Sequence, residues 1–227
     1  TVLEAGAERD ARDHRGGKMI SVITPFHNCP ELLPEYEKAV QGAQVVVIDN
    51  ASNSVTASSL QDMVERLVNG SKYIRNEANE KYSKTNNQGL AAADGEIVVF
   101  LNSDITSRGD WLSKVETVKK GAIYSATTGV RTVDGEAIRY LEGWCLFGHK
   151  SDFEMIGGWN ETDFPGLYWE DNEISYRAEK AGLELKQLFV PLLHLSNYTS
   201  MRTEGAYLHS QENRAAFERI VREGKRG

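Results

Sequence analysis

The sequence predicts an α/β fold with a mostly parallel central sheet. In the first half of the chain, short apolar runs rich in β-branched residues alternate with amphipathic stretches of helical spacing. This alternation is typical of parallel strands joined by helices that cover the faces of the sheet. The clearest run of strand-formers, Glu96–Leu101, is short, continuously apolar after its first residue and preceded by Asp94-Gly95, which is the pattern of a buried central strand.

The elements of the first half can be assigned in order from this pattern. The expected strands are Met19–Thr24 (stopped by Pro25), Gln44–Ile48, Lys72–Arg75 and Glu96–Leu101, and the expected helices are Pro30–Gln41, Ser58–Val68 and Lys84–Ala93. The first helix carries a proline at its start, where a missing N–H is tolerated. The second is amphipathic and closes at Asn69-Gly70, a common way to end a helix.

The second half mixes helices with an antiparallel element. Two β runs, Ala122–Thr132 and Ala137–Phe147, flank Asp134-Gly135, which is a strong hairpin signal. The remaining expected elements are helices at Trp111–Lys119, Ser151–Ile156, Glu170–Ala181 and Arg202–Arg222, a turn at Gly157-Gly158, and a late strand at Glu184–Phe189.

Composition narrows the classes of protein. The 227 residues fit one domain, and shares of 40% hydrophobic and 26% charged residues are those of a soluble globular protein. No apolar stretch reaches the roughly 20 residues of a membrane span, and the polar start of the chain does not resemble a signal peptide. The isolated Cys29 and Cys145 form neither a disulfide framework nor a metal motif, so we expect a cytoplasmic protein. The net charge of −7 disfavours non-specific binding to nucleic acid.

Polar side chains follow the strands of the first half, at the points where they end. They are Thr24 to Asn28, Asp49-Asn50, Asn76 to Asn79 and Asn102 to Asp104. Any one of them would suit an Asx turn, but the carboxyl ends of parallel strands meet at one edge, where ligands bind. The chain lacks G-x-G-x-x-G after the first strand, a P-loop and a G-x-S-x-G elbow. These absences disfavour a dinucleotide-binding domain, a P-loop NTPase and an α/β-hydrolase.

Seven motifs follow one another along the chain: Ser21-Val22-Ile23-Thr24-Pro25-Phe26-His27-Asn28, Val46 to Ser52, Arg75 to Asn79, Asn86-Asn87-Gln88-Gly89, Leu101-Asn102-Ser103-Asp104, Gly157-Gly158-Trp159-Asn160-Glu161 and Glu170-Asp171. In this order and spacing they resemble the motifs of an inverting glycosyltransferase of family 2 with the GT-A fold, a Rossmann-like three-layer sandwich. The resemblance implies residues 18–227 as one domain, with a nucleotide-sugar half (18–104), an acceptor half (105–200) and a C-terminal helix (201–227). Residues 1–17 lack periodicity and are expected to be a flexible tail or a cloning remnant.

The resemblance implies a divalent metal, Mn²⁺ or Mg²⁺, that holds the phosphates of a UDP-, GDP- or dTDP-sugar. Its candidate ligands are Asp104, Asn102 and His194. Asn102 stands where the family pattern has an aspartate, so the site has one negative charge less, although an amide oxygen is still a hard ligand. His194 could equally be a packed or surface histidine.

Asp171 is the candidate catalytic base, because inversion requires a carboxylate that accepts the proton of the attacking hydroxyl. The start of a helix favours the ionised form of such a group. Glu170 is the alternative base, and both residues could instead cap the helix.

The resemblance also carries over a donor site and an acceptor side. The donor residues are Thr24, Pro25, Phe26, Asp49, Asn79, Lys84, Asn87, Asn102, Ser103 and Asp104, and the acceptor-side residues are Trp144, Trp159 and Trp169. Asp49 would meet the base or ribose, or else end a strand in a turn. Lys81 stands where a glycine is common, and each tryptophan could be a core residue. The segment 157–169 is expected to form a mobile lid.

Two other functions stay open. A non-catalytic module of the same fold would bind a nucleotide sugar or glycan without turnover. A sugar nucleotidylyltransferase has a similar sheet, but its G-x-G-x-R-L pattern is missing near the first strand. The acceptor, whether glycan, lipid-linked glycan, protein or modified nucleic acid, and the oligomeric state are not indicated.

Overall fold

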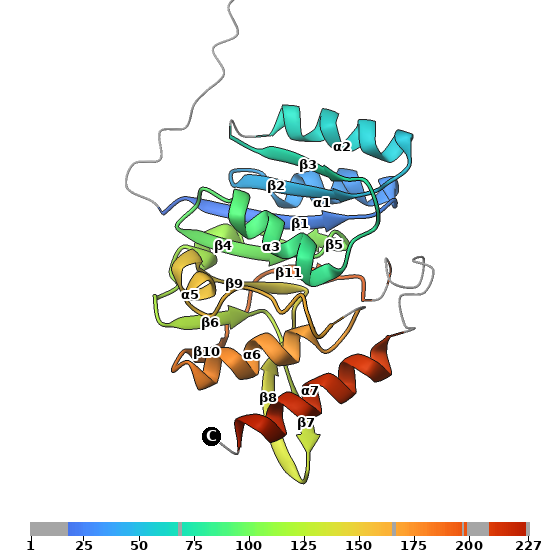
Figure 1. The fold of residues 1–227 in the computed structure, drawn as a ribbon. Coiled ribbons are helices and arrows are strands. Elements are labelled where there is room, and N and C mark those ends of the chain that lie inside the picture. Colours follow the sequence, from blue (N-terminus) through green and yellow to red (C-terminus); the bar gives the residue numbers. More distant parts are fainter. Residues whose placement is uncertain (1–17, 68–69, 165–166, 197, 199–208, 226–227) are drawn as a thin grey trace, which may run out of the picture.

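The computed structural model describes residues 18–67, 70–164, 167–196, 198 and 209–225. A seven-stranded sheet of order β10-β6-β9-β4-β1-β2-β3 forms its centre (Figure 1). Its strands are β1 Ile20–Phe26, β2 Gln44–Asn50, β3 Lys72–Asn76, β4 Ile97–Leu101, β6 Ala122–Ser125, β9 Cys145–His149 and β10 Glu184–Gln187. Two small sheets pair β5 Ile105–Ser107 with β11 Leu192–His194, and β7 Thr128–Val133 with β8 Glu136–Leu141.

Helices cover both faces of the sheet, as the alternating sequence pattern predicts. They are η1 Pro30–Leu32, α1 Leu33–Ala39, α2 Ser54–Arg66, α3 Tyr82–Ala92, α4 Leu112–Val115, α5 Lys150–Met155, α6 Glu170–Lys180 and α7 Ser210–Gly224. Side chains of α1, α2 and the segment around α4 share one core with alternate residues of the central strands, and those of α3, α5 and α6 share the other. The predicted α/β sandwich is therefore confirmed.

Strand direction also matches the prediction of a mostly parallel sheet. β4, β1, β2 and β3 run parallel, as do β6 and β10, whereas β9 is antiparallel to both of its neighbours. Close packing of α3 on β1 depends on Gly89, where a Cβ atom would lie 2.1 Å from Cγ2 of Ile23. This contact lets the helix approach the sheet directly above the strand.

The hairpin prediction is right at its turn and wrong in its extent. Asp134 and Gly135 both have positive φ, 51° and 83°, as a two-residue type I′ turn requires. Each long run, however, is divided into two strands: Ala122–Thr132 into β6 and β7, and Ala137–Phe147 into β8 and β9. β6 and β9 join the central sheet, whereas β7 and β8 pair with each other as a separate hairpin.

Other boundaries differ for local reasons. β1 continues through Pro25 to Phe26, which is possible because β4 pairs with β1 only as far as Ile23, so a proline interrupts no ladder on that side. α2 begins at Ser54 because Asn53 caps it, its Oδ1 accepting from the Thr56 amide.

The expected helix Trp111–Lys119 shortens to α4. Trp111 precedes the helix, with its indole donating to the Ala39 carbonyl, and after Val115 the backbone continues in i→i+3 turns, Thr117 donating to the Lys114 carbonyl and Val118 to that of Val115. α7 starts at Ser210, and the earlier part of the expected C-terminal helix lies outside the described residues. No helix in the described part of the chain combines the length and apolar character that crossing a membrane requires.

Candidate active site

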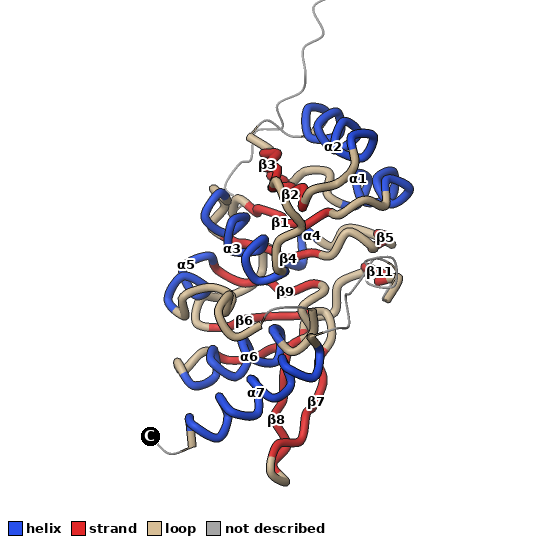
Figure 2. Tube along the Cα trace, turned by 45° about the vertical axis from the view of Figure 1, so that its right-hand side comes forward, coloured by secondary structure: helices blue, strands red, loops and turns tan. Residues whose placement is uncertain are grey.

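Asn102, Asp104 and His194 meet just beyond the carboxyl end of β4. Antiparallel pairing of β11 with β5 places His194 opposite Ile105, next to Asp104. The Nε2 atom of His194 lies 3.2 Å from Oδ1 of Asp104 and 3.3 Å from Nδ2 of Asn102. Asp104 is only 1% exposed. Figure 2 shows β5 and β11 side by side at this edge.

This donor set fits a divalent cation such as Mn²⁺. A carboxylate, an imidazole and an amide oxygen are all ligands that such an ion accepts. The Asp104 carboxylate and the His194 imidazole are in direct contact, whereas Asn102 faces His194 with Nδ2 and Tyr82 with Oδ1, so its amide would turn over to offer the oxygen to a metal. Among the described residues no group of three or more His, Cys, Asp or Glu side chains could hold a metal. Asp104 and His194 are two such side chains, and Asn102 is the further polar side chain at this corner. The indole of Trp144 covers one face of the His194 ring.

Glu170 and Asp171 begin α6 directly after two strained residues. Tyr168 and Trp169 have φ values of 76° and 77°, a left-handed conformation that bulky side chains rarely adopt. Asn213 of α7 holds this segment, donating from Nδ2 to the carbonyls of Leu167 (3.3 Å) and Tyr168 (2.9 Å). A tertiary contact with α7 therefore sustains the strain directly before the two carboxylates.

The environments of the two carboxylates differ. Burial, with the charge of Asp171 adding, raises the pKa of Glu170 to about 8. Burial also raises the pKa of Asp171, but only to about 6, because amides of Gly143 and Asn172 donate to its carboxylate. At neutral pH Asp171 is ionised and Glu170 is protonated.

Tyr82 and Gly143 link these carboxylates to the metal corner. The amide of Gly143 donates to Oδ2 of Asp171 at 3.2 Å, and the hydroxyl of Tyr82 lies 3.3 Å from the Gly143 carbonyl and 3.3 Å from Oδ1 of Asn102. Burial raises the pKa of Tyr82, and the charges of Glu170, Asp171 and Asp104 add to the shift. Tyr82 therefore lies within electrostatic reach of all three acidic side chains.

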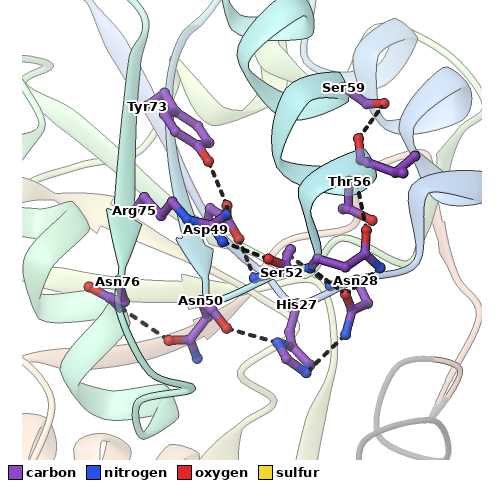
Figure 3. Close-up of polar contacts among 12 residues, drawn as sticks. His27, Asn28, Asp49, Asn50, Ser52, Thr56, Ser59, Tyr73, Arg75 and Asn76 are labelled. Carbon is purple, nitrogen blue, oxygen red and sulfur yellow. Dashed lines mark hydrogen bonds and ion pairs between the residues drawn. The ribbon is translucent and has the colours of Figure 1, made fainter.

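Asp49 lies in a second polar cluster, between β2 and β3 (Figure 3). Its Oδ2 accepts from the Tyr73 hydroxyl at 2.5 Å and from the Arg75 guanidinium, and its Oδ1 accepts from the Ser52 amide at 2.8 Å. Burial alone would raise the pKa of Asp49, but the hydrogen bonds and the Arg75 charge outweigh burial and hold it below its usual value. Asp49 is fully buried, whereas the Arg75 side chain is 42% exposed.

The other predicted donor residues take up varied positions. Phe26 packs in the core against Tyr36, whose hydroxyl donates to Thr24. Pro25 lies in β1 beside Ile48, and Ser103 is buried next to Asp104. Asn79 accepts from Asn50 at 2.6 Å. Lys84 forms an ion pair with Glu80, and Asn87 binds the backbone of Trp159 through both side-chain atoms.

The three tryptophans of the expected acceptor side are separated. Trp144 lies at the metal corner, against His194. Trp159 is a core residue, packed edge-to-face on Tyr82 and Phe100. Trp169 lies at the strained turn before α6. Within the expected lid, residues 165–166 lie outside the described residues.

Sequence reasoning did not identify Tyr82, Gly143 or Asn213. Gly143 had a weak signal, since a glycine beside Trp144 suggests a close backbone approach, and a Cβ there would lie 3.1 Å from Cβ of Asp171. Tyr82 and Asn213 carry no local signal, because their partners are distant in the sequence.

Comparisons with known proteins identify the family and the fold. The model of "Glycosyl transferase family 2" matches residues 21–157. The chain is 24% identical over 211 residues to a pre-mycofactocin glycosyltransferase of Mycobacterium tuberculosis, covering 81% of this chain and 44% of that protein. It is 25% identical over 140 residues to N-acetylgalactosaminyltransferase 7 of Drosophila melanogaster, covering 60% of this chain and 22% of the other. It thus spans less than half the length of these relatives.

Solved structures share the fold. The mannosyltransferase PcManGT from Pyrobaculum calidifontis, in complex with GDP-Man and Mn²⁺, superposes with a TM-score of 0.61 at 19% identity, covering 76% of this chain and 55% of that one. GalNAc-T7 with UDP, GalNAc and Mn²⁺ superposes with a TM-score of 0.65 at 17% identity, covering 79% and 44%. The sheet order, the helices on both faces and the match over more than half of the chain show that this chain belongs to glycosyl transferase family 2 and has the GT-A fold.

Proposed function

We propose that this domain transfers a sugar from a nucleoside-diphosphate sugar to a hydroxyl acceptor, with inversion at the anomeric carbon. The observation that carries the proposal is the chain of contacts from Asp171 through Gly143 and Tyr82 to Asn102. It holds an ionised carboxylate beside a corner that suits a metal–diphosphate group. Attack and departure on opposite sides of one carbon need such an arrangement.

The metal corner would consist of Asp104, His194 and Asn102. A bound Mn²⁺ or Mg²⁺ would neutralise the charge that develops on the departing nucleoside diphosphate. Two structures with the same fold are complexes with Mn²⁺ and with GDP-Man or UDP, which supports this donor class. The base and ribose of the donor would lie near the Asp49 cluster, whose exposed member is Arg75.

Asp171 is the base in this proposal, and the environments of the two carboxylates support that choice. A base has to be ionised at the working pH, and the pKa of about 6 satisfies this for Asp171, whereas the pKa of about 8 leaves Glu170 protonated at pH 7. Glu170 remains able to donate a hydrogen bond in its protonated form.

The test is a screen of UDP-, GDP- and dTDP-sugars with Mn²⁺, in which nucleotide release is measured with and without added glycans. We expect release from one donor class, with kcat reduced about 1,000-fold in Asp171→Asn while donor affinity changes little. Asp152→Asn is the matched control, because it changes a buried carboxylate of α5 that accepts from the Gly121 amide. Full activity of Asp171→Asn would exclude this residue as base. Nucleotide-sugar binding without release from any donor would instead favour a non-catalytic module, a function compatible with the missing charge at Asn102.

A further inference from the structure

The hairpin β7–β8 presents Arg131 beside the start of α6. Cross-strand pairs place Gly129 opposite Tyr140 and Arg131 opposite Ile138, so these four residues share one face of the hairpin. Val130 and Arg139 form a neighbouring pair and therefore project from the other face. Figures 1 and 2 show the hairpin next to α7, away from the central sheet.

Two aromatic rings hold the Arg131 guanidinium. The ring of Tyr140 lies across Gly129, where a Cβ would be only 2.4 Å from Cε1 of Tyr140, so a glycine is needed for this placement. The guanidinium carbon of Arg131 lies 5.1 Å from the centre of the Tyr140 ring and 4.6 Å from that of Trp169. Stacking on both rings fixes the plane of the cation at little cost in its own hydrogen bonds.

This cation is not neutralised by a close partner within the described part of the chain. Its Nε is buried and makes no hydrogen bond there. Other arginines nearby are paired, for example Arg214 with Glu218 at 2.8 Å and Arg222 with Asp134 at 2.9 Å. The terminal Nη groups of Arg131 are not buried, and they too form no hydrogen bond or ion pair with the described residues, so they are the donors that an incoming ligand could reach.

The position of this cation relates it to the acceptor. Trp169, which stacks on Arg131, immediately precedes Glu170 and Asp171, and Asp171 lies within electrostatic reach of the guanidinium. Arg214 approaches the same Trp169 ring, at 5.9 Å. An anion held here would lie next to the hydroxyl that gives its proton to Asp171, on the acceptor side and not at the metal corner.

We propose that Arg131 binds an oxyanion carried by the acceptor, a phosphate or a carboxylate close to the reacting hydroxyl. This inference rests on the proposed transfer reaction and names the class of acceptor. The planar fork of arginine donates two parallel N–H groups, a geometry that matches phosphate and carboxylate oxygens. A neutral glycan would leave that fork unpaired.

The first test measures binding without turnover. The protein is loaded with Mn²⁺ and UDP or GDP, whichever binds, so that the phosphate site of the donor is filled. It is then titrated separately with glycerol 3-phosphate, glycerate and glycerol, and binding is measured by calorimetry or NMR. We expect binding of one or both anions and no binding of glycerol. Binding of glycerol 3-phosphate would indicate a site for a phosphate group, and binding of glycerate a site for a carboxylate. Arg131→Gln should weaken anion binding at least tenfold, and Arg131→Lys should weaken it less because the positive charge remains although the planar fork is lost.

The matched control is Arg139→Gln, which removes the same charge from the opposite face of the same hairpin and should leave anion binding unchanged. Equal loss in both variants would mean a general charge effect and would overturn the proposal. Absence of anion binding to the wild-type protein would overturn it as well, as would undiminished binding to Arg131→Gln.

The second test uses transfer, so that the two proposals fail in distinguishable ways. Paired glycan acceptors with and without a phosphate or carboxylate should differ in kcat/KM for the wild-type protein, and Arg131→Gln should reduce this preference at least tenfold. Transfer with equal kcat/KM to both acceptors would overturn the anion site and leave the transferase intact. Arg131-dependent anion binding without nucleotide release from any donor would instead contradict the transferase and retain the site.

Discussion

The indole of Trp144 lies parallel to the imidazole of His194, with ring centres 5.0 Å apart and planes inclined by 6°. The Trp144 Nε1 donates to the Thr127 hydroxyl at 2.7 Å, and that hydroxyl donates to Oε2 of Glu142 at 2.6 Å. These hydrogen bonds fix the orientation of the indole, and stacking on the indole in turn fixes the orientation of the His194 ring. Trp144 thus acts as a positioning residue for a candidate metal ligand, and the ring face that covers His194 is not free to contact a sugar.

Loss of this stack should weaken metal binding. Trp144→Leu should reduce Mn²⁺ affinity several-fold in the presence of nucleoside diphosphate, because His194 would no longer be held toward Asp104. Trp144→Phe, which keeps a flat ring, should retain most of the affinity. Free Mn²⁺ measured by electron paramagnetic resonance gives the affinity without any turnover. Wild-type affinity in Trp144→Leu would show that the stack has no role in orienting His194.

The pH dependence of transfer should identify the base. If Asp171 accepts the proton, kcat/KM should rise tenfold per pH unit at low pH and level off near pH 6, because the ionised form is required. With Glu170 as base the same limb would lie near pH 8, since burial raises its pKa to that value. Initial rates between pH 4.5 and 9 separate the two, and a limb that persists unchanged in Asp171→Asn would exclude Asp171.

Glu170 should make the fold less stable at high pH. Its folded pKa of about 8 exceeds the ordinary value of 4.5, so the folded state binds a proton that the unfolded state has released between these values. Stability attributable to this residue therefore falls as pH rises through that range. Glu170→Gln removes the effect, and its stability relative to the wild type should increase from pH 5 to pH 8 by roughly 1–3 kcal/mol. Urea denaturation at several pH values measures this.

Glu179→Gln is the control for that experiment, because Glu179 is an exposed residue of the same helix. Its substitution should leave the pH dependence of unfolding as it is in the wild type. A constant difference between Glu170→Gln and the wild type across this pH range would contradict the assignment.

Asp49 should contribute to stability through its network. An asparagine side chain at position 49 has no negative charge to accept from both the Tyr73 hydroxyl and the Arg75 guanidinium. Asp49→Asn should therefore lower the free energy of unfolding by about 1–3 kcal/mol at neutral pH. Because the folded pKa of Asp49 is below its usual value, this loss should shrink as the pH falls and the carboxylate is protonated. Thermal unfolding measures the difference. Arg66→Gln, which breaks an exposed ion pair with Glu37, should cost much less.

Parts of the fold that depend on local pattern were predictable from the sequence. The run Ile97–Leu101 is apolar at every position because β4 is covered on both faces, and that burial leaves a direct mark on the sequence. The Asp134-Gly135 turn was also predictable from residue type, because both residues tolerate the positive φ that the turn requires. The polar cluster that ends at Asp104 and the acidic start of α6 also stood out as short, local motifs.

Features that join distant segments were not predictable in this way. Asn102 and His194 are 92 positions apart, and only the pairing of β11 with β5 brings them together. The division of the long β runs into four strands depends on which neighbours each half finds in the sheet, and residue type does not encode that choice. Arg131 shows the same limit: in the sequence it is one charged residue of a strand. Its place between Tyr140 and Trp169 exists because a glycine across the hairpin admits one ring and a strained turn supplies the other. Local propensity acts over a few residues, whereas this site is built from contacts whose partners the chain reaches only by folding.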